Sequence, residues 1–277
     1  MSKEDKDKLD ELADEQVVAD EEDITSVNGQ LKLKDRDTTN GMGYIILRHP
    51  NNGILTQDMI NRANTIYEIR YNFDLNSATI TIPENCTLKF EGGKLSNGTL
   101  TGNGTMCSGS LLNIFNKVQL AGKFSNLSCN LVWWGAKEGE GVNNSESISY
   151  AMNSSIPIIE VSGRYYMSTP VSLPYNKIIK GRSGYNNKTT GFYANNDFSP
   201  ISVDFPERYG VKPYTKTVYG MFYHRDTTRS EMHDIFIDAK HKADFCIEHI
   251  DLYGSIDLYT CYISNANVVG VLQYACE

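Results

Sequence analysis

Apolar and polar positions alternate in short runs along most of the chain, and asparagine and glycine stand between the runs. After Tyr71 the runs are three to five residues long, as in 78–82 and 86–90. Period-two runs separated by frequent corners favour stacked coils over long hairpins. The pattern therefore predicts an all-β solenoid, with an ordinary β-sandwich as the alternative.

Two stretches near the C-terminus resemble each other at a constant spacing. Residues 232–238 superpose on 258–264 at an offset of about 26 residues, a plausible length for one solenoid coil. Residues 245–248 superpose on 270–273 at almost the same offset. In both pairs apolar positions alternate with polar ones, as the strands of a coil require.

One helix is predicted in the middle of the chain. Ile148, Ala151 and Met152 have the i, i+3, i+4 spacing of an amphipathic helix, and asparagine and serine precede them. Short apolar runs follow in quick succession from 156 to 181. This segment is read as one helix that leads into a series of strands.

The acidity of the chain is confined to its N-terminus. The net charge is -8, but residues 1–25 hold eleven acids and three lysines, and the remainder holds 23 of each sign. Such a segment cannot bury enough apolar surface to order itself. We therefore expect residues 1–24 to be an acidic arm that a partner orders, and we find no basic patch that indicates nucleic-acid binding.

Several classes of protein and site are excluded or disfavoured. No run approaches the ~20 apolar residues of a membrane span, and no apolar stretch of a secretory signal follows Met1. The six cysteines form no CxxC pair and are predicted to be buried thiols. His233, His241 and His249 do not have a metal-ligand spacing, so we predict no metal and no cofactor.

A first family resemblance covers residues 133–277. It is carried by Trp134, Gly135, Ala136, Gly141, Ile148, Ala151, Gly163, Leu173 and Gly181. These positions resemble the N-terminal cap and first coils of pectate-lyase-like right-handed β-helices, which are common in phage tailspikes. The resemblance implies a right-handed parallel β-helix whose cap includes Trp134, Gly135, Ala136, Ile148 and Ala151. The family usually has aspartates where this chain has Asn143-Asn144-Ser145, which we expect to weaken the polar contacts of the cap but not the fold.

A second resemblance covers residues 16–105. It is carried by Val27-Asn28-Gly29 and by the segments 41–48, 55–61, 64–71 and 82–90. These are similar to the opening of tail fibre or tailspike proteins from phages of gut Bacteroidales, including the crAss-like group. The resemblance implies a virion protein made in the host bacterial cytoplasm. It implies a homotrimer that docks on phage tail or collar proteins and that binds a host surface glycan or receptor through a region beyond residue 277.

The two resemblances and the pattern together predict four parts. These are an acidic arm (1–24), a small virion-docking domain (25–75), a first solenoid segment (76–132) and a β-helix with a capping helix (133–277) that continues beyond the given sequence. The continuation is expected because the last strand has no polar cap, and an open coil exposes apolar surface and unpaired strand edges.

Few residues are candidates for chemistry. Leu9, Leu12, Val17 and Val18 are the apolar anchors with which the arm would dock on the virion. No catalytic residue is assigned, although Asp234 and Asp238 are the candidates of an alternative function. That alternative is a capsular polysaccharide depolymerase, either a glycoside hydrolase or a lyase, and a bacterial surface adhesin or lyase on the same fold is a further one. Exposed carboxylates of this kind are usually solvated surface.

Overall fold

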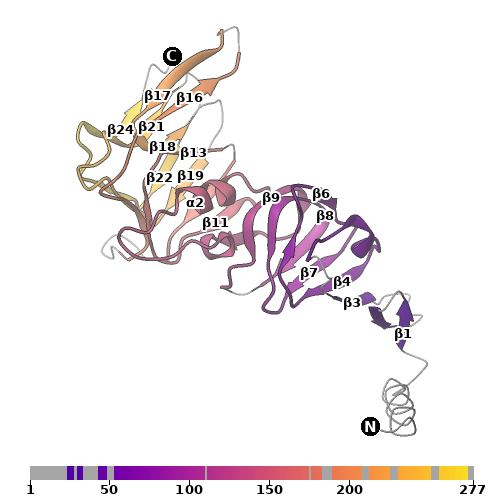
Figure 1. Cartoon of the computed structure of the whole chain (residues 1–277). Helices are drawn as coiled ribbons and strands as arrows, with labels where there is room; N and C mark the ends of the chain where they lie inside the picture. The colour runs from indigo at the N-terminus through magenta and orange to yellow at the C-terminus, as the bar shows by residue number, and fades with distance from the viewer. Residues whose placement is uncertain are drawn as a thin grey trace, which may run out of the picture.

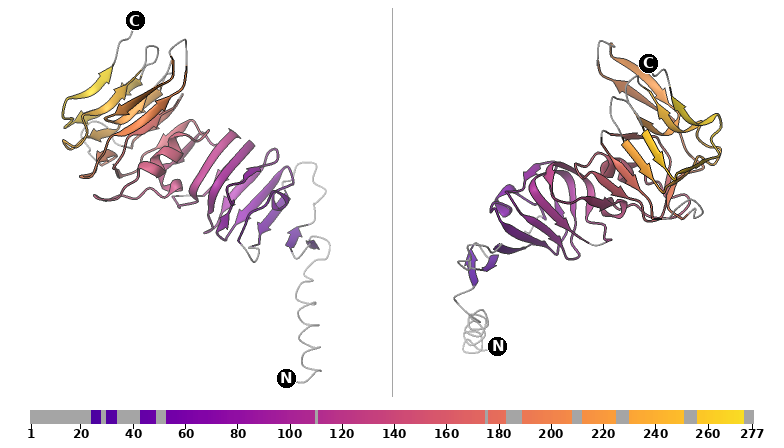
Figure 2. Two further views of the ribbon diagram at one scale, coloured as in Figure 1. Left: turned by 45° about the horizontal axis from the view of Figure 1, so that its top comes forward. Right: turned by 180° about the vertical axis from the view of Figure 1, so that it is seen from behind.

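The computed structural model describes residues 24–27, 30–33, 43–48, 53–109, 111–174, 176–182, 189–207, 212–224, 230–250 and 256–273. Short, mostly parallel strands stack into a β-solenoid of about eight coils (Figure 1 and Figure 2). The predicted all-β solenoid is thus confirmed. The described strands run from β1 at one end of an elongated molecule to β24 at the other.

The first stack is built on two faces. One face carries parallel strands β3 (Gly43–Leu47), β4 (Thr65–Ile69), β7 (Thr87–Phe90) and the end of β8 (Leu95–Ser108). The other face carries β5 (Phe73–Asp74), β6 (Thr79–Thr81), the beginning of β8 and β9 (Phe115–Phe124). An antiparallel hairpin of β1 (Ile24–Val27) and β2 (Gln30–Leu33) precedes β3, and a 3-10 turn, η1 (Gln57–Met59), lies between β3 and β4.

The solenoid begins earlier than the sequence suggested. Strands β3 and β4 fall within the segment 25–75, which was expected to be a separate docking domain, yet they pair in parallel with each other and with β7. Tyr67 and Ile69 of β4 are fully buried in the same core as the later coils. The expected boundary after residue 75 is therefore wrong. Alternation within a short strand looks the same in a hairpin and in a coil, so the pattern alone could not assign β3 and β4.

The second stack has three faces. The first carries β10 (Ser128–Asn130), β11 (Ile158–Glu160), β14 (Ile178–Lys180), β19 (Ser230–His233) and β22 (Ile256–Tyr259). The second carries β12 (Arg164–Met167), β15 (Gly191–Ala194), β20 (Phe236–Asp238) and β23 (Tyr262–Ser264). The third carries β13 (Val171–Leu173), β18 (Gly220–His224), β21 (Phe245–His249) and β24 (Val269–Gln273). A hairpin of β16 (Ile201–Phe205) and β17 (Tyr214–Val218) is inserted between β15 and β18.

Asparagines form the corners that the sequence pattern predicted. Asn64 and Asn85 have positive φ angles of 52° and 55°, a conformation that asparagine tolerates better than most residues. They stack in successive coils, because the Asn85 side-chain amide donates to the Asn64 side-chain oxygen at 2.9 Å. The corner of a coil therefore depends on a residue that can adopt the left-handed conformation and bond to its neighbour along the axis.

The predicted repeat is confirmed for the first pair of stretches and wrong for the second. Met232 pairs with Leu258 and Ile237 pairs with Ile263, both at the predicted offset of 26. Ile247, however, pairs with Val271 and not with Leu272. A shift of one residue exchanges the inner and outer faces of a strand, and both candidate partners are apolar, so the pattern did not distinguish them.

Candidate functional site

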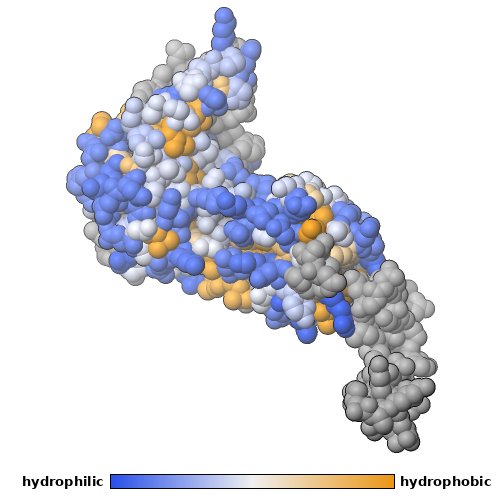
Figure 3. Space-filling view, viewed as in Figure 1, coloured by the Kyte–Doolittle hydropathy of each residue, from blue (hydrophilic) through white to orange (hydrophobic). Residues whose placement is uncertain are grey.

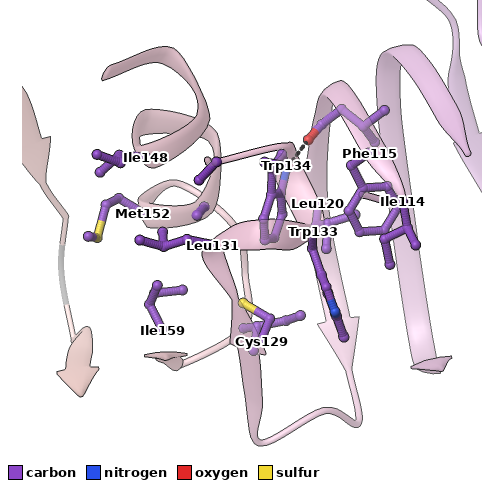
Figure 4. Packing of buried hydrophobic residues seen from close by; sticks show 14 of the residues in the cluster. Ile114, Phe115, Leu120, Cys129, Leu131, Trp133, Trp134, Ile148, Met152 and Ile159 are labelled. Carbon is purple, nitrogen blue, oxygen red and sulfur yellow. Dashed lines mark hydrogen bonds between the residues drawn. The ribbon is translucent and has the colours of Figure 1, made fainter. Parts of the chain in front are cut away.

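The two stacks are joined by a coil that contains the helices. This transition coil comprises β10, the 3-10 helix η2 (Leu131–Trp134) and the helix α2 (Ser145–Met152). The Trp134 indole donates to the Val118 carbonyl oxygen at 2.8 Å, which fastens η2 to β9 (Figure 4). The Phe115 ring lies against both tryptophans, with ring centroids 6.3 Å from Trp133 and 5.3 Å from Trp134. One hydrophobic cluster extends through this coil, from Ile45 to Ile247.

The five residues expected to form the cap all lie in the transition coil. The side chains of Trp134, Ala136, Ile148 and Ala151 are buried. Gly135 ends η2 with a φ of 83°, which glycine adopts without strain. α2 packs against η2, β9 and β13. These residues therefore join one stack to the next, and a described stack lies on each side of them.

The residues at the N-terminus of α2 form more hydrogen bonds than we expected from asparagine and serine at positions where the family usually has aspartates. The Asn144 side-chain oxygen accepts from the Lys137 backbone N–H at 2.8 Å, and its amide donates to the carbonyl oxygens of Lys137 and Tyr166, each at 3.0 Å. The Ser145 hydroxyl accepts from two backbone N–H groups of the next coil, those of 168 and 169. An ionised aspartate could accept but not donate, so asparagine suits position 144 better. The expectation of weak polar contacts here is wrong.

Of the catalytic candidates, Asp234 precedes β20 by two residues and Asp238 is its last residue. Asp234 occupies a left-handed corner with a φ of 55°, and its N–H donates to the Tyr259 carbonyl oxygen at 3.0 Å. One Asp238 carboxylate oxygen accepts from the Lys240 backbone N–H at 2.9 Å and from the Asn265 amide at 2.8 Å. These bonds are those of coil corners.

An aromatic ladder follows the outer side of the second face. The rings of Tyr166 and Tyr193 lie 5.2 Å apart, those of Tyr193 and Phe236 5.5 Å, and those of Phe236 and Tyr262 5.0 Å. The Lys240 ammonium lies 5.3 Å from the centre of the Tyr166 ring. Stacked rings cover one another's faces, so this ladder stabilises the stack along its axis. The sequence did not predict it, because tyrosine is common on both sides of strands.

The inserted hairpin is anchored to the third face by a buried carboxylate. Glu248 of β21 is fully buried, and one of its oxygens lies 3.1 Å from the Lys216 ammonium of β17. The other oxygen accepts from the backbone N–H groups of Tyr219 and Gly220, at 2.8 and 3.0 Å. Phe205 and Val218 of the hairpin pack on the solenoid beside it. The hairpin is thus a fixed part of the stack.

Four large apolar side chains are exposed around the end of β8. They are Met106, Leu111, Leu112 and Leu127, with exposed fractions between 43% and 78%, and we call them the apolar strip. Leu127 is brought beside β8 because the Asn126 side chain bonds both backbone groups of Cys107. Figure 3 shows apolar surface at the lower margin of the middle of the molecule. Exposed apolar groups that lie close together mark contact surfaces more often than isolated ones do.

Four of the five described cysteines are buried, as predicted. Cys86, Cys107, Cys129 and Cys246 are buried and unpaired, and Cys261 is half-buried. Burial raises the pKa of Cys129 to about 12 and that of Cys246 to about 11, so both thiols stay protonated at neutral pH. Leu9, Leu12, Val17 and Val18 lie outside the described residues.

The described part of the chain shows neither a metal-binding cluster nor a membrane-spanning helix. Within it, no group of three or more histidine, cysteine, aspartate or glutamate side chains is arranged to hold a metal ion. No helix among the same residues is long and apolar enough to cross a membrane.

The comparisons with known proteins do not place the chain in a family. No family model, no curated protein and no solved structure matches it.

Proposed function

We propose that this chain is a structural protein of a phage virion, the proximal part of a trimeric tail fibre or tailspike that is anchored to the tail and serves host attachment. The observation that carries the proposal is the continuous hydrophobic core that extends through both stacks. A rod that transmits force between a tail and a cell surface needs such continuity. The proposal also rests on the sequence resemblances of residues 16–105 and 133–277.

The architecture supports stiffness along the axis. Within the second stack each described coil pairs in parallel with the next one, so backbone hydrogen bonds run along the length of the stack. At the transition coil, where the strand pattern is interrupted by α2, the Trp134 bond and the Asn144 bonds take over this role. A close-packed interior has low compressibility and transmits strain. The chain therefore suits a shaft better than a hinge.

The apolar strip supports assembly into a trimer. Its four side chains belong to the first stack and have polar neighbours, an arrangement typical of contact surfaces. We assign the strip to the contact between copies, with each copy burying the Leu111 and Leu127 side chains of another. Burial of such side chains is worth about 1.5–3 kcal/mol each, which is enough for several of them to hold an assembly together.

Native mass spectrometry of the full chain tests the trimer. The wild type should give three chains at micromolar concentration, and Leu111→Glu with Leu127→Glu should give one chain with an unchanged circular dichroism spectrum. Val268→Glu, at a side chain that is 69% exposed in the second stack, is the matched control and should remain trimeric. A stable wild-type monomer contradicts the trimer, and a trimeric double variant contradicts the role of the strip.

A further inference from the structure

A depression lies beside the C-terminal end of α2. It has a volume of about 340 Å³ and is formed by the segment after α2 and by the connection from β13 to β14. Its polar lining includes Asn153 and Asn176, and its apolar lining includes Pro157 and Pro174. Sites for small ligands begin at about this volume and combine apolar walls with a few polar groups.

Lys177 gives the depression a buried cation. It lines the depression, its residue is only 5% exposed, and its ammonium donates to the carbonyl oxygens of Ser154 and Ile156. An ammonium has three N–H donors, so two such bonds leave one donor for a ligand. Among the described residues no carboxylate lies within ion-pair distance of it. A buried charge without a counter-charge is unfavourable, and a bound anion would compensate it.

The titration of Lys177 agrees with this environment. Burial lowers its pKa from 10.5 to about 8. An anion that binds next to the ammonium would favour its charged form.

We infer that this depression is a binding site for a small hydroxylated carboxylate, of the size of a single sugar acid, with Lys177 as the group that recognises the carboxylate. The Asn176 side chain can offer a hydroxyl group both a donor and an acceptor. The Asn153 amide already donates to the Ser149 carbonyl oxygen at 2.9 Å, so this side chain offers its oxygen as an acceptor. The ring edges of Pro157 and Pro174 can pack against the apolar side of a pyranose. The inference goes beyond the proposed shaft function and does not depend on it, because the site is formed within one chain.

Titration of the full chain with glucuronate, followed by calorimetry, tests the site, and glucose is the neutral control. Glucuronate should bind at least ten-fold more tightly than glucose at pH 7. Its affinity should fall about thirty-fold between pH 7 and 9.5, as Lys177 loses its proton with a pKa near 8 while Cys129 stays protonated. Equal affinity for glucuronate and glucose would overturn the inference.

Two variants assign the binding to this depression. Lys177→Met should abolish glucuronate binding. Because loss of its two bonds can also unfold the chain, Asn176→Asp provides the second test: it adds a like charge beside the ligand and leaves the Lys177 bonds intact. It should weaken glucuronate binding at least ten-fold without a change in the circular dichroism spectrum. Undiminished binding by a folded Asn176→Asp variant contradicts the site.

Discussion

Replacement of Asn144 by aspartate tests the account of the transition coil. Asn144 is 2% exposed and lies at the start of α2. Its oxygen accepts from Lys137, and its amide donates to the carbonyl oxygens of Lys137 and Tyr166. Aspartate has the same shape but, when ionised, has no donor. The variant therefore keeps the bond from the Lys137 N–H, loses the amide bonds to Lys137, Tyr166 and, at 3.4 Å, Val142, and directs a negative charge at these carbonyl oxygens.

The expected loss of stability follows from the buried groups. The Tyr166 carbonyl oxygen keeps the backbone N–H of residue 144 as a donor, so the loss comes from the bonds of the side-chain amide and amounts to about 1–3 kcal/mol. A negative charge at the N-terminus of a helix is stabilising and offsets about 0.3–1 kcal/mol of this loss of stability. We expect Asn144→Asp to lower the free energy of unfolding by about 1–2 kcal/mol at pH 7.

The neighbouring Asn143 offers a matched control. It is exposed, and its side-chain oxygen only accepts, from the N–H groups of Ser145 at 3.0 Å and Ser168 at 3.3 Å. A carboxylate can make both bonds, so Asn143→Asp should be neutral or slightly stabilising. Urea unfolding followed by tryptophan fluorescence is the assay, since both tryptophans of the chain lie in the transition coil. Equal stability of the two variants would refute the reasoning.

Three further predictions concern separate parts of the chain. The free energy of unfolding of the wild type, relative to that of Lys177→Met, should rise by about 2 kcal/mol between pH 7.5 and 9.5. The reason is that the unfolded lysine holds its proton up to its ordinary pKa of 10.5, whereas the folded lysine loses it near pH 8. Urea titrations at several pH values measure this difference, and a difference that does not change with pH contradicts the prediction. Gly191→Ala should destabilise by about 1–3 kcal/mol, since a Cβ there would overlap the Phe236 carbonyl oxygen, and thermal unfolding that is unchanged would show that the coils can separate locally. A chain lacking residues 1–22 should fold and form trimers but be missing from virions, and Leu9→Asp with Leu12→Asp should do the same; particles that contain the shortened chain at normal copy number would move docking to later residues.

The helix and the solenoid were predictable because their signals are local. Ile148, Ala151 and Met152 are spaced for one helix face, and all three are fully buried in α2. Asparagine at corners such as Asn64 and Asn85 indicates a residue in the left-handed backbone conformation. Parallel coils then follow, because strands this short with such corners cannot form long hairpins. The right hand of the solenoid and its likeness to pectate lyases stay predictions of the resemblance.

The features that the sequence did not predict depend on contacts between residues of different coils. Lys177 reads as an ordinary charged residue before a strand, and only the fold places it beneath the end of α2. Glu248 reads as an outward residue of β21, but the inserted hairpin covers it with Lys216. Tyr166 and Tyr193 are far apart in sequence and stack because one coil lies on the next. Local periodicity carries none of this information.

Immunogold electron microscopy of phage particles tests the central claim most directly. An antibody raised against residues 53–109 should label the tail region of intact virions, at the point where fibres or spikes join the tail. A competing excess of the purified chain should remove the label. If the same antibody detects the chain in infected-cell lysate but leaves purified particles unlabelled, the chain is not a virion protein and the proposed function is wrong.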